Sequence, residues 1–119
     1  MADKIVWYEI IGKDANKAQS FYSSLFGWQF DNESMPGYGM TSDKETGIGG
    51  GIGGSDMSNG AMYSTFYVGV DDIDASIAKV QELGGTVIVP KMDVPNGPTI
   101  AMFNDPDGNM VGLVQNQPM

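Results

Sequence analysis

Apolar and polar residues follow each other along this chain in a pattern that predicts strands and helices in a fixed order. Residues 5–11 are rich in strand-forming side chains and predict a strand, with Trp7 and Glu9 on the same face. Apolar positions at helical spacing then follow Asp14, a helix-capping residue type, and stop at Gly27. The chain therefore begins with a predicted strand and an amphipathic helix.

The middle of the chain predicts shorter elements and a glycine-rich stretch. Residues 28–30 and 38–41 read as extended segments on either side of a turn. Residues 47–54 are mostly glycine and contain the G-x-G-x-x-G spacing of dinucleotide-binding loops. No convincing helix start follows at residues 55–60, so we interpret the stretch as a flexible strand and linker.

The second half repeats the order of the first. Residues 63–70 predict a strand, Asp72 caps a helix that ends at two consecutive glycines, and residues 86–89 form a strand that stops at a proline. Residues 99–103 lead into a tight turn at 105–109, Asp-Pro-Asp-Gly-Asn, with apolar runs on both sides. This arrangement predicts an antiparallel hairpin.

The two halves match at a constant offset. Asp14 and Asp72 lie 58 positions apart, and Gly27 and Gly85 are separated by the same distance. Such an offset, joining two strand–helix–strands units, indicates a duplicated βαβββ module.

We therefore predict an α+β fold of two tandem βαβββ modules within a single domain, residues 1–119. Module 1 covers about residues 1–56 and module 2 about residues 61–119. One module cannot bury the face of its own sheet, so we expect the halves to pack together or to exchange with a partner chain. A homodimer is the expected assembly.

The composition limits which reactions this chain can catalyse and which partners it can bind. The formal net charge of −9, with six lysines and no arginine, disfavours nucleic acid and favours a cationic small molecule. The chain has no His, Cys or Arg, which removes the commonest general base, thiolate chemistry and the bidentate anion clamp. Acidic residues come too early for a signal peptide and no apolar run reaches membrane-spanning length, so we expect a cytoplasmic protein without membrane contact.

Four segments resemble the glyoxalase, bleomycin-resistance and extradiol dioxygenase superfamily, also called vicinal oxygen chelate proteins. They are Trp7-Tyr8-Glu9-Ile10 with Asp14; Ala18-Gln19-Ser20-Phe21-Tyr22 through Leu25-Phe26-Gly27-Trp28; Val70-Asp71-Asp72-Ile73 through Leu83-Gly84-Gly85; and Phe103 to Leu113. The resemblance implies the glyoxalase-like fold, in which each module curls its sheet into a half-barrel around a central cleft. The superfamily spans isomerases, dioxygenases, epimerases and non-catalytic drug binders, so the resemblance alone does not assign an activity.

The resemblance also implies where a metal would bind in metal-dependent members. Those positions fall at Trp7, Thr65 and Gly112, with a fourth inside residues 47–55, which contain no Asp, Glu, His or Cys. An indole, a hydroxyl and glycines do not form a metal cage. We therefore predict no metal and no other cofactor, and we do not expect metal-dependent glyoxalase or dioxygenase activity.

We predict a ligand site in the cleft, with Glu9 as the candidate catalytic residue or polar anchor. The ligand-binding candidates are Trp7, Glu9, Tyr63, Thr65, Tyr67, Met102 and Gly112. Each has a purely structural alternative: the Trp7 ring fills space, the Met102 side chain packs, and the carboxylate and hydroxyls satisfy one another by hydrogen bonds.

Two functions follow from these residues. The favoured one is a metal-independent protein that binds a small organic molecule, with sequestration of a cationic antibiotic as a special case. The alternative is a metal-free lyase or isomerase that acts on a small carbonyl compound through Glu9 or a tyrosine. We favour binding over catalysis.

Overall fold

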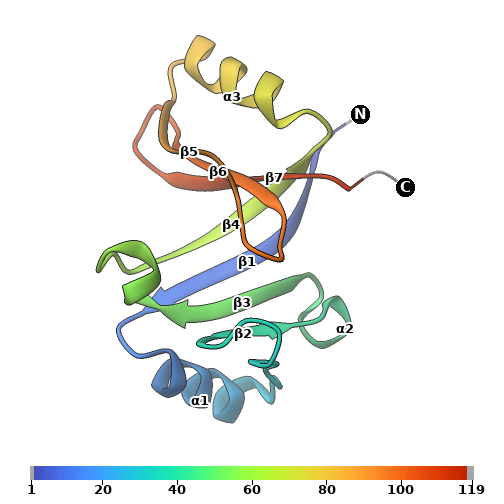
Figure 1. The fold of residues 1–119 in the computed structure, drawn as a ribbon, viewed down its shortest axis with the longest axis vertical. Helices are drawn as coiled ribbons and strands as arrows, with labels where there is room; N and C mark the ends of the chain where they lie inside the picture. The colour runs from blue at the N-terminus through green and yellow to red at the C-terminus, as the bar shows by residue number, and fades with distance from the viewer. Residues whose placement is uncertain (1, 118–119) are drawn as a thin grey trace. The chain divides into compact units, whose positions relative to one another are not determined.

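A computed structural model describes residues 2–117, which divide into two compact units (Figure 1). One unit is Val6–Thr65, and the other combines residues 2–5 with residues 66–117. In chain order the elements are β1 (Lys4–Gly12), α1 (Ala15–Phe26), β2 (Tyr38–Thr41), α2 (Asp43–Thr46), β3 (Gly49–Gly54), the 3-10 helix η1 (Ser55–Ser58), β4 (Tyr63–Val70), α3 (Ile73–Glu82), β5 (Thr86–Asp93), β6 (Thr99–Asn104) and β7 (Met110–Gln115). This mixed composition confirms the predicted α+β class.

The first unit packs α1 against a sheet in which β3 is the middle strand. β1 pairs with one edge of β3 in parallel orientation, and β2 pairs with the other edge of β3 in antiparallel orientation. The Asp14 side chain accepts a hydrogen bond from the Lys17 backbone N–H at 3.1 Å and so starts α1. Gly27 ends the helix in the left-handed region at φ 77°, where its N–H bonds the Ser23 carbonyl. Both predicted ends of this helix are confirmed.

The glycine-rich stretch is a buried strand, so our interpretation of it as partly a linker is wrong. All six residues of β3 are buried between β1 and β2. A Cβ at Gly49 would lie 3.1 Å from the Trp7 ring, and one at Gly51 would lie 2.5 Å from the Tyr38 hydroxyl oxygen. The missing side chains thus leave room for aromatic rings from the neighbouring strands.

The extended segment expected at residues 28–30 does not form a strand. Only Asp31 bridges to the sheet, opposite Met40. The Asp31 carboxylate accepts the Glu33 N–H at 2.8 Å and the Ser34 hydroxyl at 3.2 Å, which turns the chain away from the sheet. The first half therefore has one strand fewer than the βαβββ pattern predicts.

The second unit packs α3 on a sheet in the order β4–β7–β6–β5, with β4 parallel to β7 and the other pairs antiparallel. Its core consists of Val70, Ile73, Ala101 and Leu113. Asp72 caps α3 by accepting the Ala75 N–H at 3.1 Å, as predicted.

Two features near the end of the chain can be compared with their predictions. The hairpin at 105–109 is confirmed: the Asp105 N–H bonds the Asn109 carbonyl at 2.8 Å, and Gly108 adopts φ 92°. β5 does not stop at Pro90 but continues to Asp93, because an edge strand tolerates a residue that donates no ladder hydrogen bond.

Among the described residues, no helix has the length and apolar character needed to span a membrane.

Candidate functional site

A hydrogen-bonded group in the first unit surrounds the Glu9 carboxylate; we call it the Glu9 cluster and define it as Trp7, Glu9, Tyr38 and Tyr63. The Tyr63 hydroxyl donates to Glu9 Oε1 at 2.7 Å, and the Tyr38 hydroxyl donates to Oε2 at 2.7 Å. Trp7 Nε1 donates to the Tyr38 hydroxyl at 2.9 Å. Glu9 is only 9% exposed, so a buried carboxylate is held by two phenols, one of them fixed by an indole.

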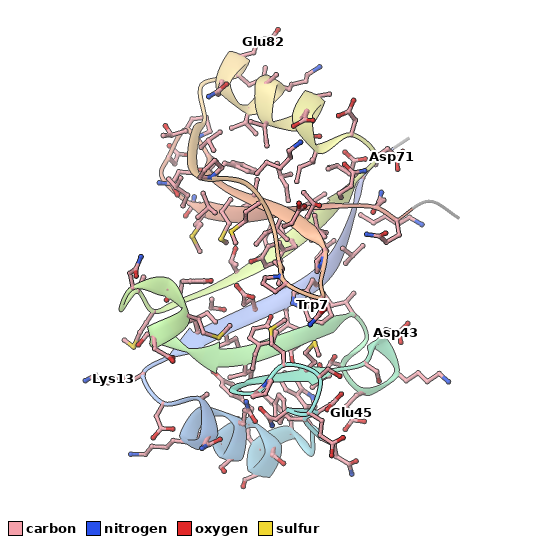
Figure 2. The ribbon with its side chains drawn as sticks, in the orientation of Figure 1. Trp7, Lys13, Asp43, Glu45, Asp71 and Glu82 are labelled. Atoms are coloured by element: carbon pink, nitrogen blue, oxygen red, sulfur yellow. The ribbon has the colours of Figure 1, made fainter. Side chains whose placement is uncertain are left out.

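The sheet of the first unit explains how these side chains meet. Trp7 lies on β1 (Figure 2). It shares one face of that strand with Glu9, two residues further on, and its ring rests against Gly49 of β3. Tyr38 comes from β2, on the far side of β3. Its ring crosses β3 over Gly51, which pairs with Glu9, and so reaches the carboxylate.

Tyr38 is the functional candidate that the sequence analysis missed. A run of glycines in a buried strand leaves a surface that large neighbouring side chains must cover. Tyr38 lies in the short strand that precedes this run, and this proximity is the signal that would have indicated it.

Burial and charge fix the protonation of the Tyr63 phenol. The pKa of Tyr63 is raised well above its usual value of 10, first by burial and then by the charge and hydrogen bond of Glu9. Tyr63 therefore keeps its proton at neutral pH. It acts as a hydrogen-bond donor in this cluster and not as a base.

Three further candidates lie in the second unit; we call Tyr67, Met102 and Gly112 the Tyr67 cluster. The Tyr67 hydroxyl donates to Met102 Sδ at 3.8 Å, and both side chains are buried. Gly112 pairs with Tyr67 between β4 and β7 and with Met102 between β7 and β6. The Tyr67 ring covers Gly112, where a Cβ would lie 2.5 Å from Cε2.

Thr65 is half-buried on β4, at the end of the first unit. Residues two apart on a strand point to the same side, so Thr65 shares a face with Tyr63. The structure thus brings Tyr63 directly to Glu9 and links Trp7 to Glu9 through Tyr38. It brings Tyr67, Met102 and Gly112 together in the other unit.

The donor atoms at the implied metal positions do not suit a divalent ion. Within residues 2–117, no group of three or more Asp, Glu, His or Cys side chains is placed to hold a metal. The Trp7 indole N–H is already donated to Tyr38, and the Tyr67 ring fills the space beside Gly112. The residues present therefore do not fit the metal that the superfamily holds in its metalloenzymes.

Comparisons with known proteins agree on the family. The family model described as Glyoxalase/Bleomycin resistance protein/Dioxygenase superfamily matches residues 4–113. The "Putative glyoxylase CFP32" of Mycobacterium tuberculosis is 34% identical over 116 residues, which cover 92% of this chain and 44% of that protein. The "Probable lactoylglutathione lyase" of Vibrio cholerae is 32% identical over 118 residues, covering 87% and 84%. The chain thus spans less than half of the mycobacterial relative but most of the Vibrio one.

Solved structures share the fold at low sequence identity. The hypothetical protein BH1468 from Bacillus halodurans aligns with a TM-score of 0.71 and 13% identity, covering 100% of this chain and 98% of that one. A glyoxalase/bleomycin resistance protein/dioxygenase superfamily member from Vibrio splendidus aligns with a TM-score of 0.65 and 19% identity, covering 97% and 100%. These likenesses show the fold.

Proposed function

Because the chain belongs to the Glyoxalase/Bleomycin resistance protein/Dioxygenase superfamily, we propose that it binds a small organic molecule without a metal, using the Glu9 cluster as its polar anchor. The observation that carries this proposal is the geometry of Glu9. Its two oxygens each accept one phenol O–H at 2.7 Å. A buried carboxylate whose two oxygens are both oriented by phenol donors presents a fixed acceptor to a donor group of a ligand.

The surroundings of Glu9 favour a cationic or N–H-bearing ligand group. The chain carries a formal net charge of −9, which raises the local concentration of cations. The half-buried Trp7 indole, whose N–H is fixed by Tyr38, offers a ring face to a planar or cationic group. Tyr63 adds a second ring whose hydroxyl stays protonated. A cationic antibiotic is one ligand with these properties.

We propose metal independence because the positions implied for a metal carry an indole, a hydroxyl and a glycine, at Trp7, Thr65 and Gly112. A binder built in this way holds its ligand through hydrogen bonds and aromatic contacts. Elemental analysis of the purified full-length chain, before and after incubation with Ni²⁺ or Zn²⁺, tests this directly. We expect less than one-tenth of an equivalent of metal after desalting, and stoichiometric retention would overturn metal independence.

Calorimetric titration tests the anchor. Bleomycin serves as the bulky cationic probe, and no heat at millimolar concentration would remove antibiotic binding as a special case. With a probe that binds, Glu9→Gln should weaken affinity at least tenfold, because a neutral amide removes the ion pair. The matched control is Glu33→Gln, an exposed carboxylate in the same unit, which should change affinity less than twofold. Equal effects of the two variants would contradict Glu9 as anchor.

A second candidate function is a metal-free lyase or isomerase acting on a small carbonyl compound. It is favoured by the relative named as a lactoylglutathione lyase, which is 32% identical over most of its length. Glu9 would then take a proton from carbon beside the carbonyl, while a phenol hydroxyl donates a hydrogen bond to the carbonyl oxygen. The test is turnover of the methylglyoxal–glutathione adduct by metal-stripped protein. Turnover that disappears in Glu9→Gln supports catalysis, whereas absence of turnover in the wild type argues against it.

A further inference from the structure

Met57 lies between solvent and the buried ring of Tyr38. It belongs to η1, the short helix that follows β3, and its side chain is 51% exposed. Its sulfur nevertheless lies against the sheet, because a Cβ at Gly53 would be 2.9 Å from Met57 Sδ and 2.8 Å from Tyr38 Cδ1. The sulfur and the ring edge therefore share the space above Gly53, an arrangement in which thioethers and aromatic rings attract each other.

The Tyr38 ring connects Met57 to the Glu9 cluster. One edge of the ring meets Met57, and the hydroxyl at its tip lies over Gly51, where a Cβ would be 2.5 Å away. That hydroxyl donates to Glu9 Oε2 at 2.7 Å and accepts the Trp7 indole N–H at 2.9 Å. Tyr38 is only 5% exposed, and in a close-packed interior the position of a ring follows from the groups around it. A change at Met57 is therefore transmitted to both hydrogen bonds.

The surroundings of the Met57 sulfur are apolar on the side of the sheet. The Gly60 N–H donates to the Ser55 carbonyl at 2.7 Å and holds η1 in place. Ile11, which is 3% exposed, closes the space beside the sulfur, since its Cδ1 would lie 3.3 Å from the same Cβ at Gly53. The thioether thus lies among apolar groups, while half of the side chain is open to solvent.

A thioether with this exposure is open to oxidation by hydrogen peroxide. A lone pair of Met57 Sδ attacks one peroxide oxygen, so that an S–O bond forms as the O–O bond breaks. The departing hydroxide takes the proton of the new S–OH group and leaves as water. The sulfur loses two electrons and the peroxide gains them. The product, methionine sulfoxide, is polar, and its oxygen needs a hydrogen-bond donor that the Ile11 side chain and the edge of the Tyr38 ring do not offer.

We propose that Met57 is a site of reversible peroxide oxidation, at which sulfoxide formation displaces the Tyr38 ring and loosens the Glu9 cluster. The sulfoxide turns toward water, where its oxygen finds hydrogen-bond donors, and uncovers the ring edge above Gly53. Tyr38 then no longer holds the Glu9 carboxylate and the Trp7 indole in their present geometry. The resulting loss of ligand affinity rests on the proposed function, whereas the oxidation and the altered hydrogen bonds do not.

The NMR signal of the Trp7 indole N–H tests the proposal without any ligand, because that group donates to Tyr38. Hydrogen peroxide treatment of the full chain should add one oxygen at Met57, located by peptide mass spectrometry. It should speed exchange of the Trp7 indole N–H with solvent by about fivefold, because the hydrogen bond to Tyr38 is lost. The two methionine sulfoxide reductases, one for each sulfoxide epimer, should restore the original rate. The indole N–H of Trp28 is the internal reference and should exchange at a constant rate.

Three variants separate Met57 from the other exposed methionines. Met57→Leu keeps an apolar side chain without sulfur, so peroxide should leave the Trp7 exchange rate unchanged. Met57→Gln places a polar group of similar length at the site and should speed the exchange without any oxidant. The matched control is Met92→Leu, which removes a methionine that is 45% exposed in the other unit and should respond to peroxide as the wild type does.

Four results would overturn the proposal. They are oxidation of Met92 with Met57 left unmodified, an unchanged Trp7 exchange rate after Met57 is oxidised, a wild-type response to peroxide in Met57→Leu, and an unchanged exchange rate in Met57→Gln. Calorimetric titration with bleomycin separates this proposal from the proposed function. Weaker binding by the oxidised chain than by the reduced chain supports both, and no binding by either form contradicts the proposed function alone.

Discussion

Replacing Gly112 by alanine tests the claim that the Tyr67 ring occupies the space beside β7. Gly112 lies opposite Tyr67 in the β4–β7 pair, and a Cβ there would lie 2.5 Å from Cε2 and 2.7 Å from Cγ of the tyrosine. Ordinary contacts of a Cβ fall between 3.4 and 4 Å, so one of the two groups must move by close to 1 Å.

Neither group can move cheaply. Tyr67 is buried, and its hydroxyl donates to Met102 Sδ. Gly112 is held by strands on both sides. Overpacking of this kind costs about 1–3 kcal/mol. At this chain length, a loss of 1 kcal/mol lowers the melting temperature by about 4 °C.

Urea unfolding of single and double variants measures this cost. Tyr67→Ala alone should lose about 3–5 kcal/mol, as buried aromatic truncations do. In that background Gly112→Ala should cost nothing further, because the ring that it would meet is gone. The control is Gly12→Ala at the end of β1, whose new Cβ would meet only the Ala18 Cβ at 3.8 Å. It should change stability by less than about 1 kcal/mol.

Two results would refute the reasoning. If Gly112→Ala is as stable as the wild type, the ring does not limit the space beside β7. If the losses of unfolding free energy caused by the two substitutions add in the double variant, the two effects are independent. The contact between Tyr67 and Gly112 then does not explain them. In either case the Tyr67 cluster would give no reason for a glycine at this position.

Two predictions concern pH. Because the folded pKa of Tyr63 is raised above its unfolded value of 10, its contribution to stability is complete below pH 10 and is lost as pH rises toward the folded pKa. Burial, followed by the charge and hydrogen bond of Glu9, raises this pKa, so Tyr63→Phe should flatten the alkaline fall in unfolding free energy measured by urea titration, and an unchanged slope would contradict the raised pKa of Tyr63. The pKa of Asp105 is lowered, chiefly by the Asn109 backbone N–H, so its contribution is present above pH 3.8 and is lost in more acidic solution. Asp105→Ala should reduce the fall of the unfolding free energy in acidic solution, measured by the same urea titrations, and a steeper fall would contradict this expectation.

Local signals in the sequence determined the two long helices, α1 and α3, and the last hairpin, whereas the short helices α2 and η1 were not predicted. Asp14 and Asp72 cap their helices through their own side chains, and Gly27 ends α1 by adopting a positive φ. The Asp105 carboxylate accepts backbone N–H groups of Asp107 and Asn109 within its own turn. Each of these interactions spans a few residues, so the residue types and their spacing were sufficient to predict them.

Segments whose neighbours are distant in sequence could not be placed in this way. Residues 49–54 read as flexible because glycine carries no pattern, yet the rings of Tyr8 and Tyr38 make the segment a buried strand. Residues 28–30 had strand propensity, but the turn made by Asp31 left only a single bridge. In the first case tertiary contacts overrode local preference, and in the second a neighbouring turn did.

The candidate site shows the same division. Strand alternation determined that Trp7 and Glu9 share a face, and the types of residue in the sequence determined that no His or Cys could contribute. The tertiary structure decided that Tyr38 reaches Glu9 from β2 across a glycine of β3 and that Tyr63 shares the same carboxylate. Tyr38 lies 29 positions from Glu9 in the sequence, and Tyr63 lies 54 positions from it. Hydrogen bonds over such separations depend on strand order and register, which no local pattern encodes.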